Sequence, residues 1–149
     1  MSTYHQISEL SGLENTIVTI GTFDGVHLGH QKIIKRLVEL KEKQGGEIVL
    51  FTFDPHPRKI LFPEQKDLKL ITTTDEKCAV LKQFGVDHVL VFPFTKEFSQ
   101  MQAQDYISNI IVKGLKTKTL VIGYDHRFGS NREGNIETLK QLSEIYNFN

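Results

Sequence analysis

The stretch Gly21-Thr22-Phe23-Asp24-Gly25-Val26-His27-Leu28-Gly29-His30 decides the fold, because it joins an apolar run to a helical pattern through glycines. Residues 16–20, before it, are rich in β-branched side chains and predict a buried strand. After it, residues 31–43 carry apolar side chains at helical spacing, at positions 33, 34, 37, 38 and 40. The stretch is therefore a turn that leads from a strand into the N-terminus of a helix.

This turn suits a phosphate group. The first N–H groups of a helix have no partners inside the helix, and the dipole there favours an anion by about 0.3–1 kcal/mol. Glycine lets backbone and ligand approach closely. His27 and His30 are three residues apart and project to one side, where either ring can donate a hydrogen bond to a phosphate oxygen.

A His-x-Gly-His pattern also has two other interpretations, a pair of metal ligands or a solvated turn without a function. A structural zinc site lacks partners, since Cys78 is the only cysteine and no second Cys/His cluster lies nearby. Cys78 lies on an apolar helical face, which favours a core residue over a nucleophile.

The composition indicates one soluble globular domain with small-molecule partners. The chain has 149 residues, 39% of them apolar and 24% charged. Lys plus Arg and Asp plus Glu are both 18, which gives no indication of nucleic-acid or membrane binding. Residues 1–12 show no signal-peptide pattern, so a cytoplasmic location is expected.

Alternating strand and helix patterns predict a doubly wound α/β domain with a parallel sheet covered on both faces. The predicted strands are residues 16–22, 47–53, 88–94 and 119–124, and the predicted helices are 30–43, 74–84, 102–113 and 135–146. Thr73 with Glu76 resembles a capping box, and glycines at 45, 46, 85 and 114 stand where helices should stop. Residues 61–70 are the most loop-like segment.

Ligands of open parallel sheets lie beyond the carboxyl ends of the strands, and three of the predicted strand exits are chemically unusual. The first is the His27/His30 turn. The second is residues 53–58, where Pro55 and Pro57 restrict Asp54 and His56 to extended conformations. The third is residues 123–129, followed by Asn131-Arg132-Glu133-Gly134. Stiff loops with aromatic and basic groups suit a flat ligand with polar edges, although each residue singly also fits a core or solvated role.

These motifs resemble the N-terminal FMN adenylyltransferase module of bacterial bifunctional riboflavin kinase/FAD synthetases. The resemblance covers nearly the whole chain and rests on residues 21–31, 52–57, 123–129 and 131–134. The first motif alone is shared in outline by many nucleotidyltransferases, whereas all three together are specific to this family. The resemblance implies a Rossmann-like nucleotidyltransferase fold over residues 1–149.

The resemblance also implies a reaction, the transfer of AMP from Mg-ATP to FMN to give FAD and pyrophosphate. His27 and His30 would act on the ATP phosphates, and Mg²⁺ would arrive with ATP rather than on a protein ligand. The other implied ATP-binding residues are Gly21, Thr22, Phe23, Asp24 and Gly29. The implied flavin-binding residues are Phe53, His56, Pro57, Tyr106, Asp125 and Phe128.

The sequence departs from the family pattern at its C-terminal end. Family modules continue with another strand and a Ser/Thr-rich motif ending in Arg, and then with a riboflavin kinase domain, whereas this sequence stops at Asn149. We therefore expect a module without its C-terminal part or the kinase domain, with an exposed sheet edge. His126 stands where the loop often has an aromatic residue.

Two alternatives to this function remain open. One is a different nucleotidyltransferase of the same superfamily, acting on a phosphopantetheine or a nicotinate nucleotide. The other is a flavin- or nucleotide-binding module without catalysis. Product analysis distinguishes the three.

Overall fold

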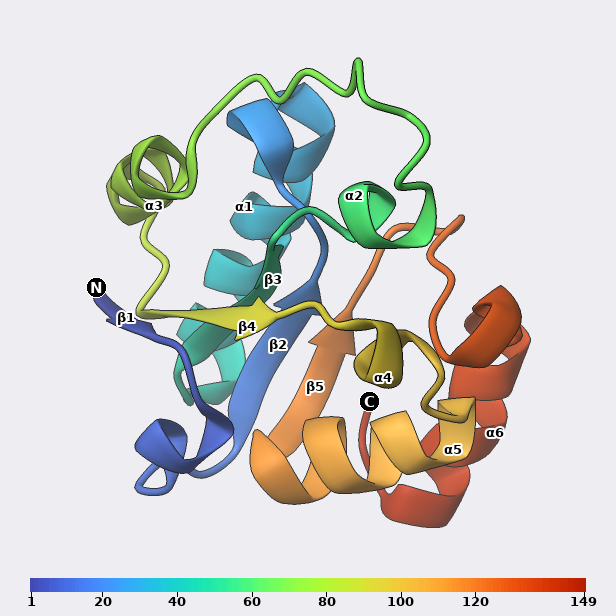
Figure 1. Ribbon diagram of the computed structural model, residues 1–149. Helices are drawn as coiled ribbons and strands as arrows, with labels where there is room; N and C mark the ends of the chain where they lie inside the picture. Colours follow the sequence, from blue (N-terminus) through green and yellow to red (C-terminus); the bar gives the residue numbers. More distant parts are fainter.

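The computed structural model describes residues 1–149 and has a five-stranded, wholly parallel sheet at its centre (Figure 1). Its strands are β1 (Ser2–Tyr4), β2 (Thr16–Ile20), β3 (Ile48–Asp54), β4 (His88–Pro93) and β5 (Thr117–Val121). They lie in the order β1-β4-β3-β2-β5. The order reverses between β2 and β5, which is where a doubly wound sheet places its ligand crevice.

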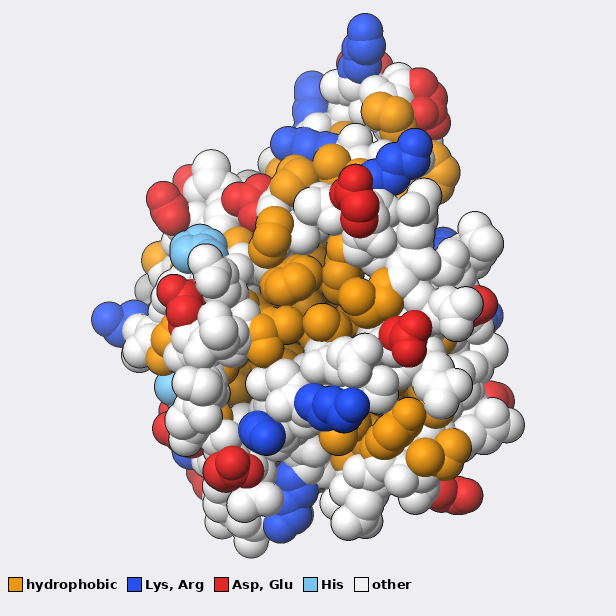
Figure 2. Space-filling model, turned by 60° about the horizontal axis from the view of Figure 1, so that its bottom comes forward, with side chains coloured by type: hydrophobic (Ala, Val, Ile, Leu, Met, Phe, Trp, Pro, Cys, Tyr) orange, Lys and Arg blue, Asp and Glu red, His pale blue; other side chains and the backbone are white.

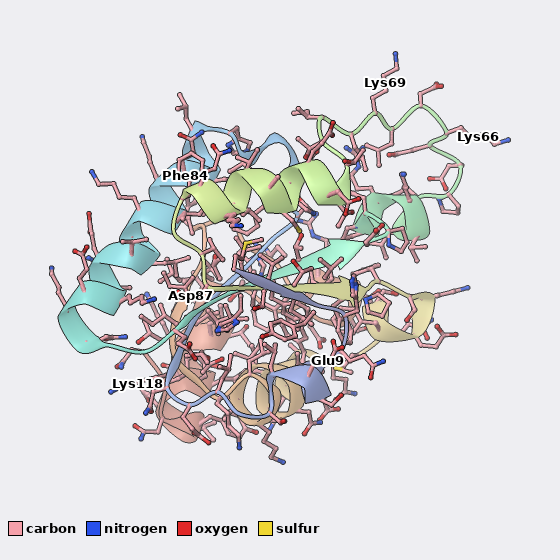
Figure 3. The ribbon with its side chains drawn as sticks, turned by 90° about the vertical axis from the view of Figure 1, so that its left-hand side faces the viewer. Glu9, Lys66, Lys69, Phe84, Asp87 and Lys118 are labelled. Carbon is pink, nitrogen blue, oxygen red and sulfur yellow. The ribbon has the colours of Figure 1, made fainter.

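Helices cover both faces of the sheet. On one face lie α1 (Leu28–Gln44) and α3 (Thr74–Gln83), and on the other lie α5 (Ala103–Asp105), the π-helix η3 (Tyr106–Gly114) and α6 (Ile136–Tyr146), as Figures 1 and 3 show. Side chains of alternate strand residues point to opposite faces of the sheet and form two hydrophobic cores. Ile17 and Leu50 pack with α1 and α3, whereas Val18 and Phe51 pack with η3 and α6. The predicted doubly wound α/β architecture is confirmed.

Short elements fill the connections. They are the 3₁₀ turns η1 (Ile7–Leu10), η2 (Asp24–Val26) and η4 (Ser130–Arg132), together with α2 (Pro57–Leu61) and α4 (Lys96–Ser99). The predicted capping box of Thr73 and Glu76 is present, and α1 ends at Gly45, which has a φ of 72°. None of the helices is long and apolar enough to cross a lipid bilayer.

Several boundaries differ from the sequence prediction. Strand β5 covers residues 117–121 rather than 119–124, because its pairing with β2 begins at Thr16 and Thr117. The single helix predicted over 102–113 is α5 followed by η3, whose end shows the wider π pattern, with Leu115 N–H donating to Ile110 O at 2.9 Å. β1, α2 and α4 were not predicted, since three to five residues carry no readable period.

The sheet edge at β5 is partly paired, contrary to the exposed edge expected from the sequence. The Asn149 N–H donates to Lys118 O at 2.9 Å, and the Leu120 N–H donates to Asn149 O at 2.7 Å. The backbone of Asn149 thus lies beside β5 and satisfies one carbonyl and one N–H of that strand.

Residues 62–73 form no helix or strand, which confirms the prediction that residues 61–70 are loop-like. The segment arches from α2 to α3, and Lys66 and Lys69 lie on its outer side and point away from the molecule (Figure 3). Its far end is fastened to the turn after β2, because the Asp24 carboxylate accepts hydrogen bonds from the N–H groups of Ile71 and Thr72, both at 2.9 Å.

Candidate functional site

The turn after β2 presents its two histidines side by side. His27 is the N-cap of α1, and its Nδ1 accepts hydrogen bonds from the N–H groups of Gly29 at 3.1 Å and His30 at 3.4 Å. A neutral imidazole that accepts at Nδ1 carries its proton on Nε2. The cap therefore fixes the tautomer of His27 and leaves Nε2–H as a donor.

His30 stacks on His27, with ring centroids 3.6 Å apart and an interplanar angle of 20°. Its other neighbour is Phe23, at 4.7 Å, which is almost fully buried with a left-handed φ of 51°. The Nδ1 atom of His30 is buried and has no hydrogen-bond partner in the chain. His30 is thus held by stacking on His27 and by a tilted contact with Phe23, and the predicted placement of both histidines on one side is confirmed.

His30 is neutral at physiological pH. Burial, together with the charges of His27 and Lys77 and against the opposing charge of Asp24, lowers its pKa to about 4. Because the folded-state pKa lies below the unfolded value of about 6.5, the unfolded chain binds the extra proton first. This histidine therefore makes folding less favourable as the pH falls from about 6.5 to about 4.

A titration of the ring signals of His30 by NMR checks this assignment. We expect no change in the His30 ring signals between pH 8 and pH 6, and protonation only near pH 4, because the buried ring resists charging. The signals are assigned by comparison with His30→Ala. A His30 ring that titrates near 6.5 would contradict the buried, stacked arrangement.

His56 repeats the geometry of His27 at the end of β3. It caps α2, and its Nδ1 accepts from the Arg58 N–H at 3.2 Å, while Pro57 occupies the first turn of that helix. Burial lowers the pKa of His56, against the opposing charge of Asp24. His56 has a φ of -56° and a ψ of 132°, and Pro57 opens a helix that needs no N–H there, so the backbone is compatible with the restriction expected from the prolines. The stiffness of this loop stays a prediction.

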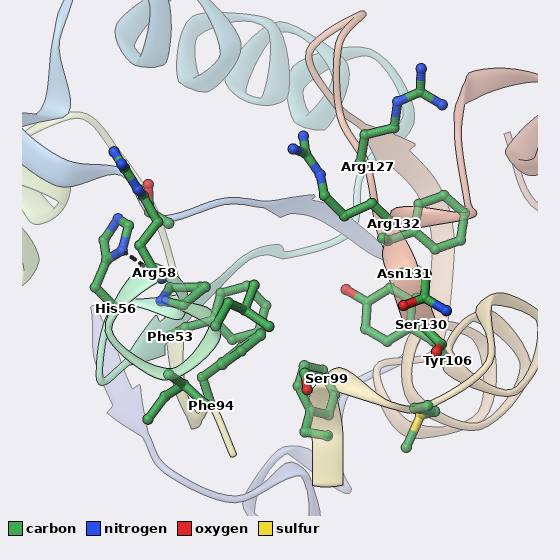
Figure 4. A pocket seen from close by; sticks show the side chains of 18 of the residues that line it. Phe53, His56, Arg58, Phe94, Ser99, Tyr106, Arg127, Ser130, Asn131 and Arg132 are labelled. Carbon is green, nitrogen blue, oxygen red and sulfur yellow. Dashed lines mark hydrogen bonds between the residues drawn. The ribbon is translucent and has the colours of Figure 1, made fainter. Parts of the chain in front are cut away.

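A cavity of about 1070 Å³ lies at the carboxyl ends of the strands (Figure 4). Residues that follow β2, β3, β4 and β5 all contribute to its wall. Among the residues predicted from the sequence, it is lined by Gly21, Thr22, Phe53, His56, Pro57, Tyr106, Asp125 and Phe128. The structure thus brings all six predicted flavin-binding residues to one cavity.

The other predicted nucleotide residues lie outside that lining. Phe23 belongs to the core beneath α1, and the side chain of Asp24 is engaged with Ile71 and Thr72. His27, Gly29 and His30 lie at the N-terminus of α1. Only Gly21 and Thr22 belong both to the histidine turn and to the cavity wall. These two residues therefore join the two halves of the site, which are the His27/His30 turn and the aromatic cavity.

Aromatic rings make up the apolar wall of the cavity. Tyr106 and Phe128 lie with centroids 5.7 Å apart, and Phe53 packs against Phe94 at 5.4 Å and Phe98 at 5.8 Å. Phe128 pairs by backbone hydrogen bonds with Gly134. Such a wall favours a flat, largely apolar ligand.

Basic side chains stand around this apolar wall. Arg58, Lys96, Arg127 and Arg132 line the cavity together with a single acid, Asp125. Figure 4 shows Arg58 on the opposite side from Arg127 and Arg132, and none of the ion pairs in the chain uses these four basic residues. A space-filling view of one face shows a hydrophobic hollow with both basic and acidic side chains at its margin (Figure 2). The combination suits a planar ligand that carries a negative group.

The exit of β4 was missed by sequence reasoning. Phe94, Lys96, Phe98, Ser99, Gln100 and Met101 all line the cavity. Its position could have identified this segment, because Phe94 directly follows β4 and the segments after the other three strands were already candidates. Phe94 and Phe98 were passed over because an aromatic residue near a strand is equally typical of a core.

Cys78 lies half-buried against the core formed with α1 and α3, as predicted. Burial raises the pKa of its thiol, which disfavours the thiolate that a nucleophile requires. No thiol chemistry is therefore indicated at this site.

Comparison with known proteins agrees with this geometry. Residues 10–149 match the family model described as FAD synthetase. The chain is 37% identical over 144 residues to the bifunctional riboflavin kinase/FMN adenylyltransferase of Escherichia coli strain K12, covering 97% of this chain and 45% of that protein. It is 31% identical over 136 residues to the protein of the same name from Bacillus subtilis, covering 91% of this chain and 42% of that protein.

The fold has a solved neighbour, a crystal structure titled macrolide-efflux protein from Streptococcus pneumoniae. The TM-score is 0.83 at 29% sequence identity, over 94% of this chain and 46% of that one. The chain spans less than half the length of the curated relatives it matches. With a family match over residues 10–149 and a site assembled from the motifs that carry the resemblance, the chain belongs to the FAD synthetase family.

Proposed function

We propose that this chain is an FMN adenylyltransferase module, which transfers AMP from ATP to FMN and releases pyrophosphate. The observation that carries the proposal is the shared wall: Gly21 and Thr22 border the aromatic cavity and also open the turn that ends in His27 and His30. A ligand seated among the rings therefore ends next to a phosphate-binding turn. The family membership supports the same reaction.

The chemistry needs alignment and charge stabilisation rather than a protein nucleophile. An oxygen of the FMN phosphate attacks the α-phosphorus of ATP, a new P–O bond forms, and the bond from the α-phosphorus to the bridging oxygen breaks to release pyrophosphate. The FMN phosphate is already an anion at pH 7, so no proton has to be removed. The aromatic wall orients the flavin and thereby its phosphate.

The histidine turn would stabilise the transferring group. The Nε2–H of His27 is held as a donor by the cap at Nδ1, and the neutral His30 ring lies 3.6 Å from it, centroid to centroid. Fixed donors that meet developing charge in a partly buried site act without reorganisation, which is the largest single contribution in many such reactions. The first N–H groups of α1 add a positive dipole at the same end.

Magnesium enters this proposal as part of the nucleotide substrate. No three His, Cys, Asp or Glu side chains of the chain lie close enough together to hold a metal ion. The acid within the turn, Asp24, already accepts hydrogen bonds from Ile71 and Thr72. In this proposal Mg²⁺ is held by the ATP phosphates, whose charge it would neutralise.

The proposal extends to the surroundings of this module. Its relatives are named as bifunctional enzymes with riboflavin kinase, so we propose that residues 1–149 form the adenylyltransferase domain of such a system and that a kinase supplies FMN. We propose a cytoplasmic location, where ATP and FMN are present.

A panel of acceptors tests the substrate assignment. The purified chain is incubated with Mg-ATP and, in separate reactions, FMN, riboflavin, phosphopantetheine or nicotinate mononucleotide, and the products are separated by chromatography. We expect an adenylylated product only from FMN, because the aromatic cavity fits the flavin and only its phosphorylated form carries the attacking oxygen. Adenylylation of phosphopantetheine or nicotinate mononucleotide in preference to FMN would overturn the assignment.

A further inference from the structure

A buried cation lies directly beneath the turn that joins the two halves of the site. Lys77, in the first turn of α3, is only 6% exposed, and lysine is almost never buried to this degree unless it is paired. Its Nζ donates to the carbonyl oxygen of Thr22 at 2.9 Å and to Oγ1 of Thr52 at 3.0 Å. No carboxylate lies within ion-pair distance of it.

One partner of Lys77 belongs to the site and the other lies in the strand that leads to it. Thr22 lines the cavity and belongs to the histidine turn, and Thr52 lies in β3, two residues before Asp54. The Thr52 hydroxyl also lies 3.1 Å from the Thr22 carbonyl oxygen, to which it can donate. The Thr22 carbonyl is therefore held by donors from α3 and β3 at once, which fixes the orientation of the peptide between Thr22 and Phe23.

The charges around Lys77 connect it to both halves of the site. Burial lowers the pKa of Lys77, whereas Cys78, Asp54 and Asp24 raise it and favour the ammonium form. The positive charge of Lys77 in turn lowers the pKa of both His30 and His56. A cation placed here thus acts on the ATP-side histidine and on the flavin-side histidine together.

Alternative explanations for the burial are weaker. A lysine that only filled space could extend its ammonium to solvent along the surface of α3, as Lys82 does on the exposed side of the same helix. Lys77 instead points inward, at a desolvation cost that a well-packed apolar residue would not incur. The ammonium group is therefore compensated by its hydrogen bonds to Thr22 and Thr52 rather than by solvent.

From this geometry we infer that Lys77 is a positioning residue of the proposed transferase: it anchors the Thr22 carbonyl from below and so sets the alignment of the histidine turn with the flavin cavity. The inference rests on the proposed function. Lys77 acts through Thr22 and touches no substrate. Because alignment limits an in-line transfer, a displacement of about 1 Å in the turn would reduce turnover by about 10²-fold.

The test compares Lys77→Met with three other variants of the same chain. Lys77→Met keeps the length of the side chain but removes its donors, Thr52→Val removes one acceptor, and Thr52→Ser restores the hydroxyl. Lys82→Met is the matched control on the exposed side of α3. We expect kcat for FAD formation to fall about 10²-fold in Lys77→Met, to fall in Thr52→Val and to stay near wild type in Thr52→Ser and Lys82→Met.

Flavin affinity separates positioning from general damage. The rings that hold the flavin lie on other elements, so the dissociation constant for FMN, measured by flavin fluorescence, should stay within about threefold of wild type in Lys77→Met. If folded Lys77→Met keeps the wild-type kcat and only its melting temperature changes, Lys77 is structural and the inference is wrong.

If the wild-type chain makes no FAD, that result counts against the proposed function itself. The role of Lys77 in positioning the turn is then tested by a second measurement, which does not depend on activity. The carbonyl carbon signal of Thr22 and the ring signals of His30 are then compared by NMR. We expect both to shift in Lys77→Met and neither to shift in Lys82→Met. If they coincide in wild type and Lys77→Met, Lys77 does not set this turn, whatever the chain catalyses.

Discussion

Replacement of His30 by alanine is expected to lower FAD formation about 10²–10³-fold while leaving the fold intact. Removing one fixed donor from developing charge typically has an effect of this size, equivalent to roughly 2.7–4 kcal/mol of transition-state stabilisation. The fold should survive because His30 lies in the first turn of α1, where alanine is an excellent helix former, and no hydrogen bond from its ring would be lost.

Initial rates with saturating FMN and Mg-ATP measure this effect, and circular dichroism checks the fold. His5→Ala is the matched control, since His5 is exposed and has no place in the site. His27→Ala is less clean, because it also removes the N-cap of α1, a type of loss that lowers stability by about 0.5–2 kcal/mol. Wild-type turnover by His30→Ala would remove the histidine pair from the mechanism.

Gly129→Ala is expected to destabilise the chain by about 2–4 kcal/mol and to weaken FMN binding. Gly129 has a φ of 77° and a ψ of 176°, a conformation essentially restricted to glycine that strains any residue with a Cβ by about 1–3 kcal/mol. A Cβ at this position would also lie 2.8 Å from the backbone N and Cα of Ala103, which cannot rotate away. The backbone strain and the contact with Ala103 both raise the free energy of the folded loop.

This junction also positions the cavity wall. Gly129 separates Phe128 from the Ser130–Arg132 turn, and the Ser130 N–H donates to Met101 O at 2.7 Å. Displacing the loop would therefore move Phe128 and Arg132, both of which line the cavity. Thermal denaturation and a fluorescence titration with FMN measure the two effects.

Gly12→Ala is the control for this change, because nothing lies within 4 Å of a Cβ there and its φ is not left-handed. We expect it to melt within a few degrees of wild type. If Gly129→Ala is as stable as Gly12→Ala, the close packing of this loop on Ala103 is wrong.

Much of the fold could be predicted because each central strand is an almost continuous apolar run. Strand β3 is buried from Ile48 to Thr52, and such runs bounded by glycines and helices have few other interpretations. The edge strand β1 escaped because Ser2–Tyr4 is short, and its pairing with β4 is set by a partner more than eighty residues away.

The site was predictable to the extent that its residues stand next to strand ends. The exits of β2, β3 and β5 carried histidine, proline and glycine signals, and the cavity confirms that they meet. The exit of β4 carried phenylalanines, a lysine and residues such as Ser99 and Gln100, which sequence alone does not separate from core and surface.

Asp24 and Lys77 show why the rest of the site could not be predicted from the sequence. The family resemblance implied an ATP-binding role for Asp24, which stays a prediction, and nothing in the sequence indicated that its carboxylate accepts hydrogen bonds from Ile71 and Thr72, 47 and 48 residues along the chain. Lys77 lies on a helix with many other charges, and only the packing of α3 against β3 turns it inward. Both contacts join segments far apart in sequence, so no local pattern encodes them.

The most direct test of the central claim is to incubate the purified chain with FMN and Mg-ATP and to measure FAD and pyrophosphate together. The account predicts equal amounts of the two products, with none from riboflavin, because the FMN phosphate oxygen is the attacking group. Binding of FMN and ATP with no release of pyrophosphate would contradict it and would identify these 149 residues as a binding module without catalysis.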